Sequence, residues 1–297
     1  MGKKAWLLPM SLFGAAGLFV LTIALATPQP VRAADKADSG QVVGMKTCVQ
    51  CHSDLAKPLE RPPHAHTALT CEGCHGPGKA HVDGGGDKTK IRRFETLTPE
   101  QINNVCLKCH EKDQQAHWVG STHADRGLSC ITCHDPHPKG PVMHKHLLKA
   151  SEFNLCTKCH LQRKAQLYRS AHMPMLEGKI DCTSCHNPHG NSNPAMLLQP
   201  TVNQNCYTCH AEKRGPFLWE HPPVRENCTT CHDPHGSMFN NMLRQRVPIL
   251  CQECHISSRH PSEPHTGLTK FAFNQGCLNC HPMIHGSNNP SGTAFQR

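Results

Sequence analysis

The sequence predicts a mostly irregular fold with short α-helices and almost no β-sheet, organised as an elongated chain of five repeats. Three observations favour this class. The 297 residues include 24 Pro and 22 Gly, which interrupt regular elements throughout the chain. Aromatic residues make up only 5%, too little bulk for an ordinary core of this size. The 20 cysteines fall into evenly repeated short motifs, described below.

The first 33 residues are predicted to be an export signal. Lys3 and Lys4 precede an uncharged run over residues 5–31, and the sequence VRA at 31–33 offers a small-residue cleavage site. An uncleaved membrane anchor is the alternative, because the run is long enough to span a bilayer. Since no cysteine precedes Cys48, a lipid anchor is disfavoured. We therefore expect a signal peptide over 1–33 and one mature domain over 34–297.

Every cysteine belongs to a C-x-x-C pair that is followed at once by histidine. The cysteines are Cys48, Cys51, Cys71, Cys74, Cys106, Cys109, Cys130, Cys133, Cys156, Cys159, Cys182, Cys185, Cys206, Cys209, Cys228, Cys231, Cys251, Cys254, Cys277 and Cys280. The motif histidines are His52, His75, His110, His134, His160, His186, His210, His232, His255 and His281. This pattern is typical of c-type haem attachment. The two thiols form thioethers with the vinyl groups of the porphyrin, and the histidine is the proximal iron ligand.

Zinc sites, redox C-x-x-C motifs and disulfides explain this pattern less well. Zinc sites combine two C-x-x-C units per metal without a histidine after each, and a thioredoxin-like motif occurs once in a βαβ unit. An exported protein resides in an oxidising compartment, where unpaired thiols become disulfides, but here no cysteine lies outside a C-x-x-C-H motif. The sequence thus predicts ten covalently bound haem c groups, whose apolar surfaces supply the missing core.

The motifs alternate in a two-haem repeat of roughly 50 residues. The odd motifs begin at Cys48, Cys106, Cys156, Cys206 and Cys251, and the even motifs at Cys71, Cys130, Cys182, Cys228 and Cys277. Two further families of histidine recur at a fixed phase. Those after the odd motifs are His64, His123, His172, His221 and His265, and those after the even motifs are His81, His137, His189, His235 and His285. Because these ten match ten haems, we expect them to be distal ligands.

The five remaining histidines have no counterparts in the other repeats. They are His66, His117, His144, His146 and His260, and we interpret them as surface or supporting residues. His260 lies close enough to His265 to replace it. A methionine ligand is the other alternative, but Met143, Met196 and Met242 belong to an apolar pattern that is expected to pack on haem. Two histidines per iron leave no open coordination position.

The sequence CTTCHDPHG over 228–236 contains both kinds of histidine. Pro136, Pro188 and Pro234 each precede a histidine of the even family and disfavour a helical residue before them. We therefore predict that His235 is turned away from the haem of His232 and binds a different one. The expected partner is the odd haem of the same repeat, while His221 serves a neighbour in return.

The charge of the polypeptide is not a nucleic-acid signal. Residues 34–297 carry 28 basic and 22 acidic side chains, or +6. Two propionates on each haem add about −10 when all haems are oxidised and about −20 when all are reduced. The holoprotein is therefore expected to be acidic, and no nucleic-acid partner is predicted.

Ten motifs with CHDPH and CHNPH in even positions, CEGCHGPGKAH in the first repeat and a signal sequence resemble the MtrA/DmsE family of periplasmic decahaem cytochromes. The resemblance spans Cys48 to about His285. It implies an electron wire that receives electrons from periplasmic or inner-membrane donor cytochromes. The wire enters an outer-membrane β-barrel porin and passes electrons to an extracellular multihaem cytochrome or an extracellular reductase. The implied localisation is the periplasm, in association with the outer membrane.

Physical reasoning agrees with a wire. A compact globule of this length would have a radius of gyration of about 18 Å, shorter than an outer membrane, and the mature sequence has no apolar span. Two other functions remain open. One is a soluble periplasmic electron shuttle or store. The other is a multihaem nitrite or hydroxylamine-type enzyme, which needs an open haem that nothing in the motifs indicates.

Overall fold

A computed structural model describes residues 40–56, 64, 70–138, 144–256, 276–290 and 292–295. The chain divides into two units, residues 1–39 and residues 40–297. The predicted signal peptide therefore lies outside the described residues, and its boundary stays a prediction. All motif cysteines and motif histidines lie in the second unit.

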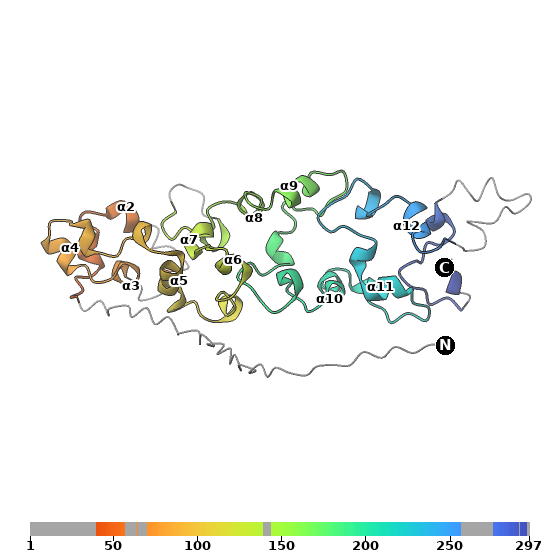
Figure 1. Cartoon of the computed structure of the whole chain (residues 1–297), viewed down its shortest axis with the longest axis horizontal. Coiled ribbons are helices and arrows are strands. Elements are labelled where there is room, and N and C mark those ends of the chain that lie inside the picture. Colours follow the sequence, from red (N-terminus) through yellow and green to blue (C-terminus); the bar gives the residue numbers. More distant parts are fainter. Residues whose placement is uncertain are drawn as a thin grey trace, which may run out of the picture. The chain divides into compact units, whose positions relative to one another are not determined.

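The second unit consists of short helices joined by loops, as predicted (Figure 1). The α-helices are α1 (Met45–Cys48), α2 (Ser53–Ala56), α3 (Cys71–His75), α4 (Lys79–Asp83), α5 (Pro99–Leu107), α6 (Thr122–Asp125), α7 (Cys130–Cys133), α8 (Glu152–Cys156), α9 (Leu161–Leu167), α10 (Val202–Tyr207), α11 (Pro222–Glu226) and α12 (Ile249–Gln252). Extended pairing among the described residues is confined to isolated bridges, such as His186 with Leu197.

Short 3-10 helices complete the described secondary structure. They span Lys88–Lys90, Phe94–Thr96, Asp113–Gln115, Lys145–Leu147, Cys182–Ser184, Pro194–Met196, Ala211–Lys213, Cys228–Thr230, Asn240–Met242, Cys277–Asn279 and Gly292–Ala294. In the described residues no helix is both long and apolar enough to cross a membrane.

The five repeats occupy residues 40–97, 98–150, 151–200, 201–246 and 247–297. Repeats 2, 3 and 4 each begin at a hydroxyl N-cap of the helix that carries the odd motif. The caps are Thr98, Ser151 and Thr201, whose side chains accept a hydrogen bond from the backbone N–H three residues on. Each of these helices ends at the first motif, so the cap fixes where the motif begins.

A buried polar side chain joins the two motifs within each of these repeats. Asn203 is 7% exposed, donates to the carbonyls of Val224 and Arg225, and accepts from the N–H of Cys228 at 2.7 Å. Asn103 holds Cys130 in the same way in repeat 2, where the N···O distance is 2.8 Å. In repeat 3 the carboxylate of Glu152 takes this place and accepts from Thr183. The odd helix thereby fixes the start of the even motif.

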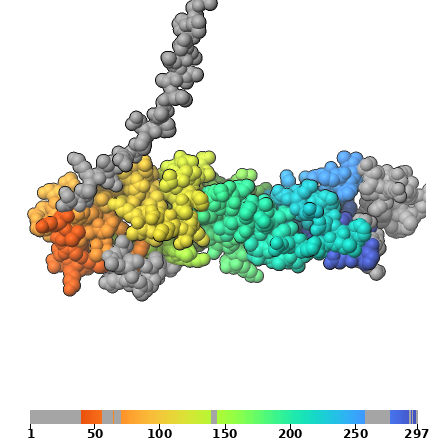
Figure 2. Space-filling view, turned by 90° about the horizontal axis from the view of Figure 1, so that it is seen from below, coloured from red at the N-terminus to blue at the C-terminus, as the bar shows by residue number. Residues whose placement is uncertain are grey.

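Neighbouring repeats along the chain contact each other. Among the described residues, hydrogen bonds and ring contacts between repeats connect repeat n with repeat n+1, for example Ala171 with Ser237 and Trp219 with Ser287. The colours of this unit accordingly change in chain order in Figures 1 and 2. Such nearest-neighbour stacking is typical of repeat proteins.

Glycine permits the closest of these junctions. Gly236 has φ 125°, and a Cβ there would lie 2.2 Å from the carbonyl oxygen of Gln166 in the preceding repeat. Gly190 and Gly286 stand at the same place in repeats 3 and 5, with a Cβ clash at 2.6 Å and 2.2 Å respectively. In each case the glycine directly follows a histidine of the even family. At Gly190 and Gly236 the added Cβ would meet backbone atoms of the preceding repeat, whereas at Gly286 it would meet the ring of Phe217.

We predict that Gly236→Ala destabilises the holoprotein by roughly 3 kcal/mol, at the upper end of usual single substitutions. The added methyl group would meet a backbone oxygen that has no freedom to rotate away, and a positive φ is unfavourable for alanine. Guanidinium unfolding followed by the haem absorbance measures the change. Gly178→Ala is the matched control, because its φ is also positive at 66° but nothing lies within 4 Å of the new Cβ. Equal effects in both variants would contradict the close junction.

Candidate haem-binding sites

Each C-x-x-C-H motif forms one helical turn. The backbone N–H of the motif histidine donates to the carbonyl of the first cysteine at 2.9–3.1 Å in the motifs outside α3, and in the motif of α3 the same residues are helical. One turn places both thiols and the imidazole on a common side, as two thioethers and an axial bond to a single porphyrin require. None of the twenty motif cysteines forms a disulfide in the structure.

The motifs form an unbroken succession of neighbouring thiols. Within each repeat, the first cysteine of the odd motif lies close to the first cysteine of the even motif: Cys48 to Cys71, Cys106 to Cys130, Cys156 to Cys182, Cys206 to Cys228 and Cys251 to Cys277. Between repeats, the second cysteine of the even motif lies near that of the next odd motif: Cys74 to Cys109, Cys133 to Cys159, Cys185 to Cys209 and Cys231 to Cys254. Groups attached to these thiols would therefore follow one another in chain order.

Motif histidines face phased histidines in pairs. Eight such pairs occur in the described residues: His52 with His81, His64 with His110, His75 with His137, His123 with His160, His134 with His189, His186 with His235, His221 with His255 and His232 with His285. Each contains one motif histidine and one of the predicted distal ligands. Their ring centroids are 6.1–6.4 Å apart.

This spacing fits a metal between two imidazoles. A metal–imidazole nitrogen bond is about 2.0 Å and the ring nitrogen lies about 1.1 Å from the ring centre, so two axial imidazoles have centroids roughly 6.2 Å apart. Direct stacking would bring the rings closer, to about 4.5–5 Å in many offset pairs. The paired rings thus leave the room that one iron atom occupies.

Most pairs cross from one repeat to the next, in both directions. At the junction of repeats 2 and 3, His123 of repeat 2 faces the odd motif histidine His160, while His189 of repeat 3 faces the even motif histidine His134. The junctions of repeats 1 with 2 and 4 with 5 have the same reciprocal arrangement. The pair His52 and His81 lies within repeat 1.

The expected partner of His235 is wrong. His235 lies opposite His186, the even motif histidine of repeat 3, at 6.1 Å between ring centroids, and not opposite His210 of its own repeat. It is turned away from His232, as predicted, and His232 faces His285 instead. The reason is the tight junction at Gly236, which brings this segment against the preceding repeat.

Among the described residues, one predicted distal ligand, His172, faces no motif histidine. Its Nε2 donates to Glu177 Oε1 at 3.2 Å, and its Nδ1 lies 2.7 Å from the carbonyl oxygen of Arg169. No ring contact joins it to His210 among the described residues. His265 lies outside the described residues, as do His66, His260 and Met143.

The Nδ1 atoms of the even motif histidines are held by backbone carbonyls further along the chain. The acceptors are Arg92 for His75, His146 for His134, Ala195 for His186, Asn241 for His232 and Ala294 for His281. A proton on Nδ1 leaves the Nε2 lone pair for a metal. The exposed side chain of His146 takes no part, since only its carbonyl is used.

An unusual backbone conformation directs three of these carbonyls. His146, Ala195 and Asn241 have φ of 57°, 52° and 57°, and the residue after each also has a positive φ. These residues lie in the apolar segments that contain Leu147, Met196 and Met242. Left-handed conformations of such residues are unfavourable, so the segments are held by the bonds they make, including Asn187 N–H to the carbonyl of Met196 at 2.8 Å.

The aspartate or asparagine before each proline forms a turn that positions the second histidine. Oδ1 of Asp135, Asn187 and Asp233 accepts from the N–H of the histidine two residues on, at 2.9, 3.1 and 3.1 Å. This Asx turn directs the imidazole away from its own motif. That these side chains hold the second histidine was not predicted from the sequence. The D/N-P-H pattern that recurs in repeats 2, 3 and 4 would have indicated it.

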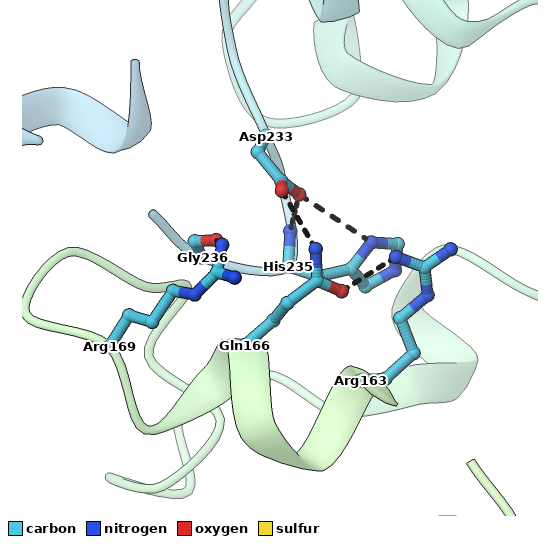
Figure 3. A network of polar contacts seen from close by, with 6 residues as sticks. All are labelled: Arg163, Gln166, Arg169, Asp233, His235 and Gly236. Atoms are coloured by element: carbon cyan, nitrogen blue, oxygen red, sulfur yellow. Dashed lines mark hydrogen bonds and ion pairs between the residues drawn. The ribbon is translucent and has the colours of Figure 1, made fainter. Parts of the chain in front are cut away.

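A polar network holds the turn of His235 against the preceding repeat (Figure 3). From α9, Gln166 Nε2 donates to Asp233 Oδ2 at 2.8 Å, and Arg163 Nη1 donates to Gln166 Oε1 at 2.6 Å. Arg169 Nη1 donates to the carbonyl of Gly236 at 3.1 Å. In repeat 3, Asn187 Nδ2 similarly reaches the carbonyl of Gln114 in repeat 2 at 3.0 Å. The turn residue therefore binds both its own histidine and the neighbouring repeat.

Burial keeps these second histidines neutral. It lowers the pKa of both His189 and His235 to about 4, assisted by the nearby His134 for the former and by Arg163 for the latter. A neutral imidazole is the form that binds a metal. The arrangement therefore presents His189 and His235 as neutral imidazoles, each opposite a motif histidine.

Glu72, between the cysteines of CEGCH, secures the start of the described chain. Its carboxylate accepts from the N–H groups of Val43, Gly44 and Gly78 at 2.8, 2.9 and 2.8 Å. Desolvation raises the pKa of this carboxyl, but the three backbone hydrogen bonds outweigh it and hold the pKa below its ordinary value.

This stabilisation should be present above the ordinary glutamate pKa and lost as the pH falls through the lowered one. We expect Glu72→Gln to expose the amides of Val43 and Gly44 to hydrogen exchange at pH 6, relative to the unsubstituted protein at the same pH. The difference should disappear near pH 3, where the carboxylate is protonated. Glu95→Gln is the control, since Glu95 is exposed and bonds to no amide of this segment. Equal protection at pH 6 would contradict the assignment.

Two family models match the chain. The doubled CXXCH motif matches residues 172–215 and 221–260, and the NrfB-like c-type cytochrome model matches residues 71–159. Both matches lie on the segments that carry the histidine pairs described above.

Two curated relatives and one solved structure are similar to the chain. The multihaem cytochrome MtrA of Shewanella baltica is 41% identical over 275 residues, covering 86% of this chain and 81% of the relative. The dissimilatory sulfite reductase MccA of Wolinella succinogenes is 25% identical over 161 residues, 40% of this chain and 22% of the relative. An undecahaem cytochrome from the S-layer of Carboxydothermus ferrireducens aligns with 77% of this chain and 32% of its own at 17% identity, with a TM-score of 0.13, which supports no conclusion about the fold.

Proposed function

The chain belongs to the MtrA family of multihaem c-type cytochromes, and from this premise we propose that it conducts electrons along ten haems through an outer-membrane β-barrel. As a family member it is an electron-transfer cytochrome that binds haem c covalently through paired C-x-x-C-H motifs. The haem supplies the one-electron Fe(III)/Fe(II) couple, and the chain supplies its attachment, its axial ligands and its surroundings.

The observation that carries the proposal is the set of histidine pairs with a gap for one iron each. We assign the motif cysteines to the thioethers, the motif histidines to the proximal position and the phased histidines to the distal position. At the other junctions, the phased histidine after an odd motif faces the odd motif histidine of the next repeat. On this pattern we assign His172 as the distal ligand of the haem of His210. In the last repeat we assign His265 to the haem of His281. Two strong ligands on every iron favour rapid electron transfer over substrate binding, because no coordination position remains open.

The order of the motifs in space supports a conduit in particular. First cysteines lie close together within a repeat and second cysteines lie near each other between repeats, so ten attached haems would follow one path from the first repeat to the last. A store of electrons would need no such order. A path of this kind is what transfer between two separated partners requires, here a periplasmic or inner-membrane donor and an extracellular cytochrome or reductase. Periplasmic export and association with the outer membrane follow from this assignment.

The axial assignment is tested with His186→Met and His235→Met. Methionine in place of one histidine raises the potential and changes the spectrum of the haem concerned. If the two histidines share an iron, each single variant and the double variant alter one haem, and all covalent haems remain in the mass spectrum. If they serve different irons, the double variant alters two. Redox titration with low-temperature absorbance, or electron paramagnetic resonance, counts the altered haems. His144→Met is the control, since His144 belongs to neither phased family.

The conduit assignment requires a partner that the chain enters. We expect the holoprotein to co-purify from detergent-solubilised outer membranes with a large β-barrel. Liposomes that contain both proteins and enclose a redox dye should then transfer electrons across the bilayer, while liposomes with either protein alone should not. A holoprotein that is recovered free of any barrel and that reduces only soluble partners would instead indicate a periplasmic shuttle.

An enzyme of the nitrite or hydroxylamine type is excluded by the same preparation if every ferric haem is low-spin. A high-spin ferric signal in electron paramagnetic resonance would reveal an open position and support that alternative. The haem of His210 is the first place to look for such a signal. Its proposed distal ligand, His172, uses Nε2 to contact Glu177 in this structure.

A further inference from the structure

The Asx turn before the second histidine has the same geometry in repeats 3 and 4 but a different charge. Asn187 and Asp233 both accept from the N–H of the histidine two residues on, at 3.1 Å in each case. Asn187 carries a neutral amide, and Asp233 carries a carboxylate. The two positions therefore place the same turn next to two distal ligands while differing by one unit charge.

The side chains of His235 and His189 also differ in their surroundings, with a negative charge near the first and an amide near the second. Nδ1 of His235 is 4.0 Å from Oδ1 of Asp233. Nδ1 of His189 is buried without a hydrogen-bond partner. Around Asn187 the described bonds are neutral, since its amide donates to the carbonyls of Gln114 and Gly190 at 3.0 and 2.9 Å. The predicted ligand of one even haem thus lies beside a carboxylate, and its counterpart lies beside the neutral amide of Asn187.

A negative charge at this place acts on the iron of the preceding repeat. Oxidation adds a positive charge to the haem, and a nearby anion stabilises that state, more strongly where the side chains are partly withdrawn from water. This effect lowers the reduction potential of the haem whose distal ligand the turn holds.

Arg163 opposes this effect from the other side. It lies close enough to His235 to lower the pKa of that imidazole, after the larger effect of burial. Its guanidinium binds Gln166, which in turn binds Asp233, so an amide separates the two charges (Figure 3). His186, the other charged or titratable group facing His235, belongs to the same proposed haem. The potential therefore responds to Asp233 and Arg163 with opposite signs.

We propose that the Asx residue is a dual element: its Oδ1 positions the distal histidine, and its charge sets the reduction potential of the even haem in the preceding repeat. Asp233 lowers the potential of the haem of His186, and the neutral Asn187 leaves that of the haem of His134 higher than a carboxylate would. The inference rests on the proposed axial pairs. It adds that a single side chain of one repeat controls the potential of the haem in another.

The swap of the two side chains tests this. In the holoprotein, Asp233→Asn keeps the Oδ1 acceptor and should move one component of the redox titration to higher potential, with all haems still low-spin. Asn187→Asp should move one component to lower potential. Arg163→Gln should also lower one component, by less than Asn187→Asp, because Arg163 is exposed. Glu100→Gln removes an exposed charge far from any turn and should change no component.

A merely structural residue would not give shifts of opposite sign. Asp233→Ala, which removes the turn acceptor as well as the charge, should in addition weaken the distal bond and produce a high-spin signal. Absence of a shift in both Asp233→Asn and Asn187→Asp overturns the inference, and so do shifts in the same direction. If His235→Met alters one haem while the swaps do nothing, the axial pairs stand and only the charge effect fails. If His235→Met alters no haem, the proposed pairing itself fails.

Discussion

The exchange of histidines across the junctions of repeats 1 with 2, 2 with 3 and 4 with 5 is the constraint on which the rest of the arrangement depends. At these junctions each motif histidine faces an imidazole that belongs to the neighbouring repeat. Each such junction therefore contains two ligand sets that are completed only when both repeats are in place. Iron coordination at both sets would join the repeats more tightly than their few apolar contacts, because breaking a junction would cost two axial bonds.

The apolar core of the polypeptide is correspondingly small. Among the described residues, the buried hydrophobic side chains are Ile102, Trp118, Leu147, Leu167 and Leu197. The burial of a few side chains is far too little to offset the backbone entropy of a chain of this length. Coordination and the contact of apolar macrocycles must provide most of the folding free energy, as in small proteins that fold around a metal. Stability and electron transfer thus depend on the same groups.

The polar residues near the motifs explain how so irregular a chain keeps its ligands in place. Buried Asn103, Glu152 and Asn203 connect the two motifs of a repeat, and the Asx turns connect each second histidine to the repeat before it. Backbone carbonyls in strained left-handed segments hold the even motif histidines through Nδ1. These bonds are mostly to backbone groups, so they fix the ligand geometry without requiring regular helices or sheets.

The sequence by itself determined the cofactor chemistry and the repeat. Ten C-x-x-C-H motifs identify the attachment sites because the chemistry needs two thiols and an imidazole within one helical turn, which is a local property. The phase of the other histidines, and the prolines that break the chain after each even motif, are also readable from spacing. The short helices of the described residues, and the absence of a sheet among them, follow from the glycine and proline content.

The tertiary structure decided which histidine meets which. His235 shares a repeat with His210 but faces His186, because Gly236 lets the backbone of repeat 4 approach Gln166 of repeat 3. His210 is much nearer to His235 along the chain than His186 is, so sequence distance favours the partner that His235 does not face. The choice depends on the packing of backbone against backbone at the junction, which appears in the sequence only as a glycine after a histidine.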